Sequence, residues 1–184
     1  MRCATRVLVT AVAALAVWTS VEAQAPPQPG RVSPRAELSA VIDGVEISME
    51  YGRPSKRGRV IWGTLVPWTK WWMPGADEST SFVTSGALEV GDLLVPAGKY
   101  TIYTQPGPEV FTLIVNKQTG QFHTLYRQNM DLGRVPMTLT MLSEVVEQMK
   151  FSITPSPSAG GVLSLSWDDR AYSVALAAAP ATQP

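Results

Sequence analysis

The stretch VEISMEY, residues 45–51, decides the fold class of this chain. Apolar residues occupy every second position of the stretch, and polar residues lie between them. Successive side chains of a β-strand point to opposite faces, so this pattern predicts a strand with one face in the core and the other in solvent. The pair Asp43-Gly44, directly before it, is a common signature of a two-residue hairpin turn. The sequence therefore predicts an antiparallel hairpin around residues 43–44.

The same period of two returns later in the chain, at residues 149–154 (MKFSIT), 162–167 (VLSLSW) and 171–176 (AYSVAL). Residues 110–115 (VFTLIV) are apolar on nearly both faces, which is typical of a central strand. We predict an all-β fold, an antiparallel β-sandwich or flattened barrel of roughly ten short strands with little helix. The one helix candidate is Ser143–Met149, and its two adjacent valines disfavour a helix there.

The N-terminus has the features of an export signal. Arg2 and Arg6 precede an apolar run, Val7–Trp18, that is too short to span a membrane. Ala23 offers the small residue that signal peptidase needs, so we expect cleavage before Gln24 and a periplasmic or extracellular protein. A retained membrane anchor is the alternative, and it is disfavoured because a polar, proline-rich run follows at once.

The predicted organisation has four parts: a signal peptide at 1–23, a proline-rich linker at 24–34, a single β-sandwich domain at 35–177 and a disordered tail at 178–184. The linker and the tail contain prolines and few large apolar residues, so they have little surface to bury.

Charge and cysteine content restrict the function. The chain has 15 basic and 15 acidic side chains, so it offers no electrostatic footprint for nucleic acid or an anionic membrane. Its one cysteine, Cys3, lies in the predicted signal peptide, so we expect no disulfide, thiol nucleophile or thiolate metal site in the mature chain. We therefore expect a small molecule, a glycan or an envelope protein as partner, and no membrane insertion after cleavage.

Four stretches resemble a bacterial secreted family, the domain-of-unknown-function family numbered twenty-nine eleven. They are YGRPSKRGRVIWGTLVPWTKWWMPGADEST (51–80), LLVPAGKYTIYTQPG (93–107), VFTLIVNKQTGQ (110–121) and SLSWDDRAYSV (164–174). The resemblance covers about Arg31 to Leu176. Because that family has no established activity, the resemblance implies no reaction and no site residues of known role.

The chain departs from the family at one place. Where the family has the pattern W-R-x-G-A-N-E, this chain has Met73 in place of the arginine and Asp77 in place of the asparagine. An amide that donates and accepts has thus become a carboxylate that only accepts, so any polar site at this position in relatives is altered here. The closest matches are Arg53-Pro54, Gly58-Arg59, Gly63, Leu65-Val66-Pro67, Trp72, Gly75-Ala76 and Glu78.

Asp77 and Glu78 are candidates for acid–base chemistry in a hydrolase. Neighbours on a strand point to opposite faces, and glycosidases take their two carboxylates from positions several ångströms apart across the substrate. The structural interpretation, which we favour, is that Asp77 closes a turn after Gly75 and Glu78 pairs with a cation such as Arg53 or Arg59.

The tryptophans Trp62, Trp68, Trp71 and Trp72 cluster in the same stretch. Exposed aromatic rings hold ligands, whereas buried ones fill a core beneath a loop. We expect Trp72 to point inward and Trp71 to be accessible, with most of the cluster in the core. The candidate ligand-binding residues are therefore Arg53, Arg59, Trp71, Asp77 and Glu78.

We predict no catalytic residue, cofactor or metal. His123 is the only histidine, and no nucleophile elbow, zinc-ligand spacing or phosphate-binding glycine loop accompanies it. The leading hypothesis is an exported β-sandwich that binds a small or extended ligand, or an envelope partner, through residues 51–80. The alternatives are a hydrolase that uses Asp77 or Glu78, and a structural envelope protein without a small-molecule site.

Overall fold

The predicted hairpin is present. β2 (Arg35–Ile42) pairs antiparallel with β3 (Val45–Gly52), and the turn residues Asp43 and Gly44 have φ values of 49° and 85°. Two successive positive φ values give a turn whose twist matches that of the flanking strands. Ile47, Met49 and Tyr51 are buried, and the polar residues between them are exposed, as the alternation predicts.

The structure is a computed structural model, and it describes residues 21–24, 32–156 and 160–180. Most of the predicted signal peptide (1–20), part of the linker (25–31) and the end of the tail (181–184) lie outside the described residues. No helix in the described ranges is long and apolar enough to cross a membrane.

The strands form one antiparallel sheet that does not close into a barrel, with the order β1-β2-β3-β4-β7-β8-β9-β10-β5-β6. The all-β prediction is confirmed, and the only helix among the described residues is the 3-10 turn η1 (Gln128–Met130). The remaining strands are β1 (Val21–Gln24), β4 (Ser81–Thr84), β5 (Leu88–Val90), β6 (Leu93–Val95), β7 (Gly98–Gln105), β8 (Phe111–Asn116), β9 (Asp131–Ser156) and β10 (Gly160–Ala178).

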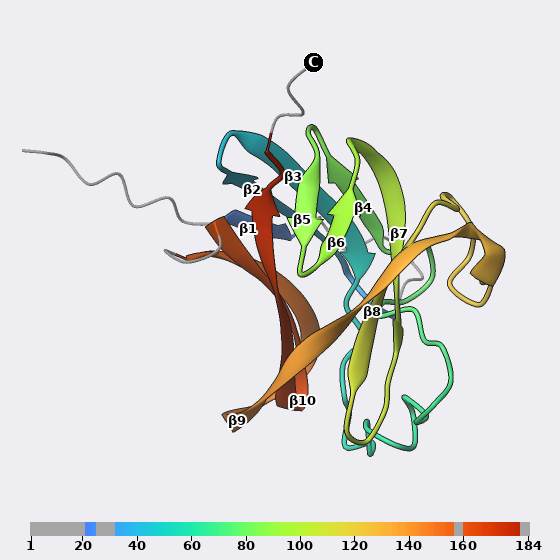
Figure 1. Cartoon of the computed structure of the whole chain (residues 1–184). Coiled ribbons are helices and arrows are strands. Elements are labelled where there is room, and N and C mark those ends of the chain that lie inside the picture. Colours follow the sequence, from blue (N-terminus) through green and yellow to red (C-terminus); the bar gives the residue numbers. More distant parts are fainter. Residues whose placement is uncertain (1–20, 25–31, 157–159, 181–184) are drawn as a thin grey trace, which may run out of the picture.

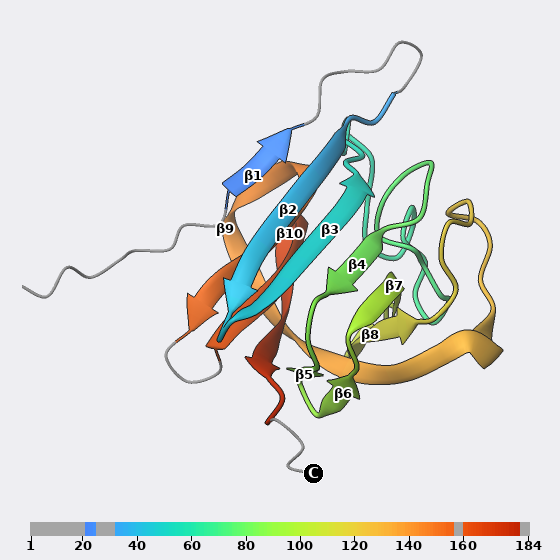
Figure 2. The same cartoon turned by 90° about the horizontal axis from the view of Figure 1, so that it is seen from above.

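Two long strands fold the sheet over onto itself. β9 and β10 have 26 and 19 residues, so they are longer than the short strands that the sequence predicts. β9 pairs with β8 through its first residues and with β10 through the rest. It therefore carries the chain from one layer to the other, and the β9–β10 hairpin lies against β2 and β3 (Figures 1 and 2). The core lies between these layers.

The helix candidate Ser143–Met149 is wrong, because these residues lie inside β9. Val146 pairs with Asp168 of β10, and Met149 is fully buried on the core face. The register between the two strands shifts on either side of Asp168, which is a β-bulge. Cross-strand pairing and β-branched side chains have thus prevailed over a weak local helix pattern.

The central strand β8 has apolar contacts on both faces, as its sequence predicts. Phe111, Leu113 and Val115 belong to the main core. Ile114 points the other way, into a smaller cluster with Met73 and Tyr103. The outer face of β7 and β8 is therefore not open to solvent at this point, because loops cover it.

Two loops provide this cover. The loop of residues 53–80, between β3 and β4, is tied to β7 by a bridge between Trp72 and Thr104. The loop of residues 117–130, between β8 and β9, is tied to the first loop by a bridge between Glu78 and Phe122. β3 and β8 run in opposite directions, so the two loops leave opposite ends of the sheet, the first low and the second high in Figure 1. They bring distant parts of the sequence together on the outer face.

Candidate ligand-binding groove

A groove of about 560 Å³ lies between the two loops on the outer face of the sheet. Small-molecule sites in proteins have volumes of roughly 300 to 1,000 Å³, so a ligand the size of a monosaccharide or somewhat larger would fit. We call it the outer groove. Its lining residues come from the 53–80 loop, β7, the 117–130 loop, η1 and β9: Pro67, Thr69, Lys70, Trp71, Gln105, Tyr126, Gln128 and Arg134.

Trp71 forms an aromatic wall of the outer groove. Its side chain is 39% exposed, and its ring lies 5.1 Å from the ring of Tyr126 and 6.0 Å from that of Tyr103, centroid to centroid. Tyr103 is fully buried, and its hydroxyl donates to the Leu125 carbonyl and accepts from Gln121 Nε2, both at 2.6 Å. The exposed indole therefore rests on a fixed aromatic base.

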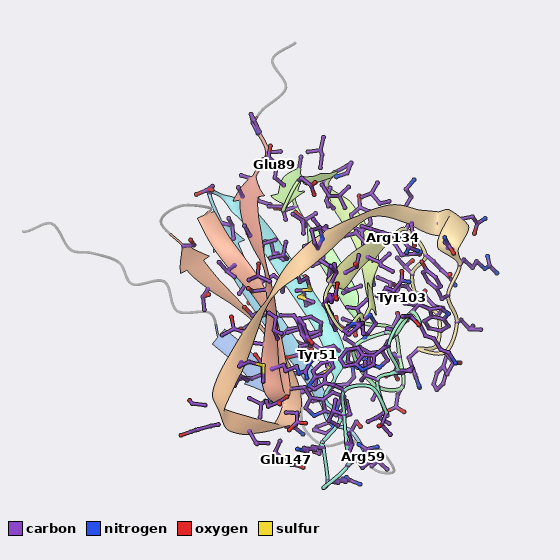
Figure 3. The ribbon with its side chains drawn as sticks, turned by 60° about the horizontal axis from the view of Figure 1, so that its bottom comes forward. Tyr51, Arg59, Glu89, Tyr103, Arg134 and Glu147 are labelled. Carbon is purple, nitrogen blue, oxygen red and sulfur yellow. The ribbon has the colours of Figure 1, made fainter. Side chains whose placement is uncertain are left out.

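Arg134 forms the polar wall. Its Nη1 donates to Gln105 Oε1 at 2.7 Å, and its Nη2 donates to the Tyr126 hydroxyl at 2.8 Å. Nε and Nη2 both donate to Asp131 Oδ2, at 3.1 and 2.9 Å. Asn116 Nδ2 donates to the other carboxylate oxygen of Asp131 at 2.7 Å. Arg134 lies near Tyr103 in Figure 3, and the network holds its guanidinium in one orientation.

The network keeps the tyrosine neutral and the arginine charged. Burial, and then the hydrogen bond and charge of Asp131, raise the pKa of Tyr126 to about 12. Burial by itself lowers the pKa of Arg134, but the bond to Asp131 and the neighbouring Tyr126 outweigh it and leave the pKa above its ordinary value. At neutral pH the Tyr126 hydroxyl is therefore a donor to Asp131 and an acceptor from Arg134.

Thr69 has a strained backbone at the rim of the outer groove. Its φ is 67°, which is rare for a β-branched residue. Its N–H donates to the Pro106 carbonyl at 2.6 Å, and its carbonyl accepts from Gln105 Nε2 at 3.3 Å. These bonds hold Lys70 and Trp71 beside the groove. Strain of this kind is enriched at binding sites, so it points to a function for this segment.

Lys70 is exposed, and it makes no side-chain hydrogen bond or salt bridge within the described part of the chain. Gln128 is likewise exposed, without a side-chain hydrogen bond there. Both side chains are therefore free to turn toward a ligand.

The tryptophans divide as the sequence predicts. Trp71 is exposed, whereas Trp72 is half-buried and stacks on Trp167 with ring centroids 6.1 Å apart. Trp62 is buried among Trp68, Trp72, Phe111 and Tyr172. The core interpretation is thus confirmed for most of the cluster, and Trp71 is the exception.

Asp77 and Glu78 do not line the outer groove. Asp77 lies in a turn with a φ of 66°, and its carbonyl accepts from the His123 N–H at 3.1 Å and from His123 Nδ1 at 2.8 Å. Glu78 pairs with Arg35 at 2.9 Å, and Arg35 also pairs with Glu50 at 3.0 Å. These contacts agree with the structural interpretation of the pair, which stays a prediction, and Arg35 is a partner of Glu78 that the sequence analysis did not name beside Arg53 and Arg59.

Arg53 and Arg59 also lie away from the outer groove lining. Arg53 Nε donates to the Met149 carbonyl at 3.1 Å. Arg59 donates to the carbonyls of Lys56 and Ser55, at 3.0 and 2.6 Å, so it braces its own loop. Arg59 lies well apart from Arg134 in Figure 3. Of the five predicted ligand-binding residues, only Trp71 lines the groove, and its contact with a ligand remains a prediction.

Sequence reasoning missed the polar wall. Tyr126, Asp131 and Arg134 lie close together in the sequence, and such a group of a phenol, an acid and an arginine is a weak signal. Gln105 and Lys70 have no local signal, because they meet only where the 53–80 loop folds over the end of β7. No cluster of His, Cys, Asp or Glu suited to a metal ion occurs among the described residues.

The fold and the groove together define the class of this protein. It is an all-β domain with a groove on the outer face of its sheet, and Lys70 and Arg134 provide hydrogen-bond donors in that groove. The chain belongs to the family described as "Protein of unknown function (DUF2911)", whose model matches residues 33–176. The resemblance found in the sequence is thereby confirmed. No curated protein and no solved structure is significantly similar to this chain.

Proposed function

We propose that this protein is an exported binding module that takes a small molecule, or the end of a glycan, into the outer groove. One observation carries the proposal: Trp71 exposes its ring on a fixed aromatic base, in a groove of ligand size that is also lined by an arginine held in place by Asp131. Apolar walls with a few fixed polar groups are typical of small-molecule sites. The strained Thr69 supports it, because its φ of 67° is unusual for a β-branched residue and such strain is enriched at binding sites.

The hydrolase alternative has less support. Asp77 and Glu78 are held by a turn and by Arg35, and none of the groove-lining residues is a carboxylate. The groove therefore offers no acid–base pair across a substrate. A structural envelope role would require no groove of this kind.

A thermal-shift screen of sugars, carboxylic acids and short peptides tests the proposal, because a ligand that prefers the folded state raises the melting temperature. We expect at least one small molecule to raise that of the wild type but not that of Trp71→Ala. Phe122→Ala is the matched control, since Phe122 is 51% exposed and does not line the groove. A ligand that stabilises wild type and Trp71→Ala equally would place binding elsewhere and contradict the proposal.

Export is part of the proposal and has its own test. The basic N-terminus, the apolar run and the Val21-Glu22-Ala23 ending support cleavage before Gln24. Intact-mass analysis of protein from the envelope or medium of the producing cell should give a chain that begins at Gln24. A mature species that still contains Val7–Trp18 would contradict it.

A further inference from the structure

The outer groove presents more hydrogen-bond donors than acceptors. Arg134 has five N–H groups, and its four bonds to Asp131, Tyr126 and Gln105 leave one of them on Nη1. Lys70 brings three further donors, and none of them has a partner within the described residues. The strongest acceptors nearby, the Asp131 carboxylate and Gln105 Oε1, already accept bonds from Arg134. A ligand rich in hydrogen-bond acceptors would therefore pair with the free donors of Lys70 and Arg134.

The charge of the groove points to an anion. Its lining contains two cations, Lys70 and Arg134, and no carboxylate. Asp131 lies behind the guanidinium and offsets its charge through a salt bridge of 2.9 Å. The charge of Lys70 has no such counterpart among the described residues. One positive charge thus remains on the groove, which favours an anionic ligand over a neutral one.

The exposed ring of Trp71 favours a ligand with a ring or another flat apolar surface. Trp71 packs on Tyr103 and Tyr126, and the rest of its ring is exposed in the groove beside Lys70. Lys70 and Trp71 are neighbours in the sequence, so one compact molecule can contact both. We propose that the outer groove binds a ring compound that carries a carboxylate, with the ring on Trp71 and the carboxylate at Lys70 and the remaining Arg134 N–H. This inference rests on the proposed function and names the chemistry of its ligand.

Matched pairs of compounds test the carboxylate. Calorimetric titrations with glucuronate and glucose, and with benzoate and benzyl alcohol, compare an acid with a neutral compound that has the same kind of ring. We expect the acid of at least one pair to bind about three- to fivefold more tightly than its neutral partner, since one exposed ion pair contributes up to about 1 kcal/mol. The pair that responds shows whether the ring is a sugar or an aromatic one. Added sodium chloride should reduce the preference.

Substitutions of Lys70 locate the charge. Lys70→Gln should abolish the preference for the acid, and Lys70→Arg should retain it. Lys99→Gln is the matched control, because Lys99 is an exposed lysine outside the groove lining and its loss should leave binding unchanged. If acid and neutral partner bind equally well, or if Lys70→Gln keeps the preference, this inference is overturned and the proposed function stands. If no compound of the screen or of these pairs binds, both are overturned.

Discussion

Thr69 and Asp77 lie near the two ends of the segment that carries Trp71 and Trp72, and both have φ values close to 66°. The left-handed region is disfavoured for residues with a side chain, and more so for a β-branched one. Backbone bonds to Pro106 and His123 hold the two residues in place. Between them, the bridge of Trp72 to Thr104 holds this segment against β7, with Trp72 packed on Trp167 and Trp71 exposed at the groove.

Thr69→Gly should raise the free energy of unfolding by about 1 kcal/mol, because glycine adopts positive φ without strain. The same variant should weaken ligand binding, since a more mobile backbone would hold Lys70 and Trp71 less firmly. Urea unfolding and calorimetric titration measure the two effects. Thr119→Gly is a control on an exposed loop threonine that is absent from the residues with positive φ. A destabilised Thr69→Gly would show that Thr69 is not strained.

Glu78→Gln should lower the free energy of unfolding by about 1 kcal/mol, because it leaves part of the charge of Arg35 uncompensated. The loss is limited because the Glu78 side chain is 46% exposed and Glu50 also pairs with Arg35. Denaturant midpoints measure it. Glu37→Gln is the control, since Glu37 lies exposed on β2 without a side-chain partner in the described structure. A more stable Glu78→Gln would contradict the structural role and reopen the hydrolase hypothesis.

At the scale of elements, the outer face of β7, β8 and β9 is covered by chain segments and not by a second sheet. Tyr103 and Ile114 project from this face, and Tyr126 of the 117–130 loop packs on them. The loop is held further by the bond of the Tyr126 hydroxyl to Asp131. The groove therefore depends on a neutral Tyr126, so we expect its structure to be lost when alkaline pH ionises this tyrosine.

Stability should fall as pH rises from about 10 to about 12. The pKa of Tyr126 is about 12 in the folded protein and about 10 in an unfolded chain, so the folded state holds this proton more tightly. Its contribution is complete below pH 10 and is lost as pH rises through the folded pKa. Urea midpoints at several pH values should fall less steeply for Tyr126→Phe than for wild type. Equal slopes would show that Tyr126 is not coupled to folding.

Sequence patterns predict the secondary-structure elements better than the tertiary contacts between them. The alternation in residues 45–51 predicts both β3 and its buried face, because local geometry and burial act in the same direction there. Ser143–Met149 was the ambiguous case, where pairing with β10 decided the conformation. Of the residues that line the outer groove, the sequence predicts only Trp71. Arg134 comes close to Trp71 because the 117–130 loop folds back over the sheet. That path depends on tertiary contacts that no local pattern contains.

At the scale of the whole molecule, β9 and β10 hold the two layers together. β10 pairs with β9 over most of its length, and its last residues, Leu176–Ala178, pair with β5. β5 in turn holds β6. The C-terminal end of β10 thus fixes a hairpin from the middle of the chain.

Leu176→Asp should destabilise the protein by about 3 kcal/mol or more, because it places a carboxylate at a fully buried position beside Val90. Ala175→Asp is the matched control, since Ala175 is the preceding residue and is exposed. We expect its effect to be within about 0.5 kcal/mol. Denaturant unfolding compares the two. Equal losses would contradict the alternation of faces at this end of β10.

The pairing of Leu176 with Val90 also sets an order of events during biosynthesis. A ribosome makes residues 88–95 long before residues 176–178, so the β5–β6 hairpin waits for nearly half of the chain before its partner strand emerges. A two-stranded hairpin has marginal stability in water, and pairings this far apart in sequence form slowly. The domain therefore completes this part of its fold only after residues 176–178 have been made, and the edge of β5 stays without its partner strand until then.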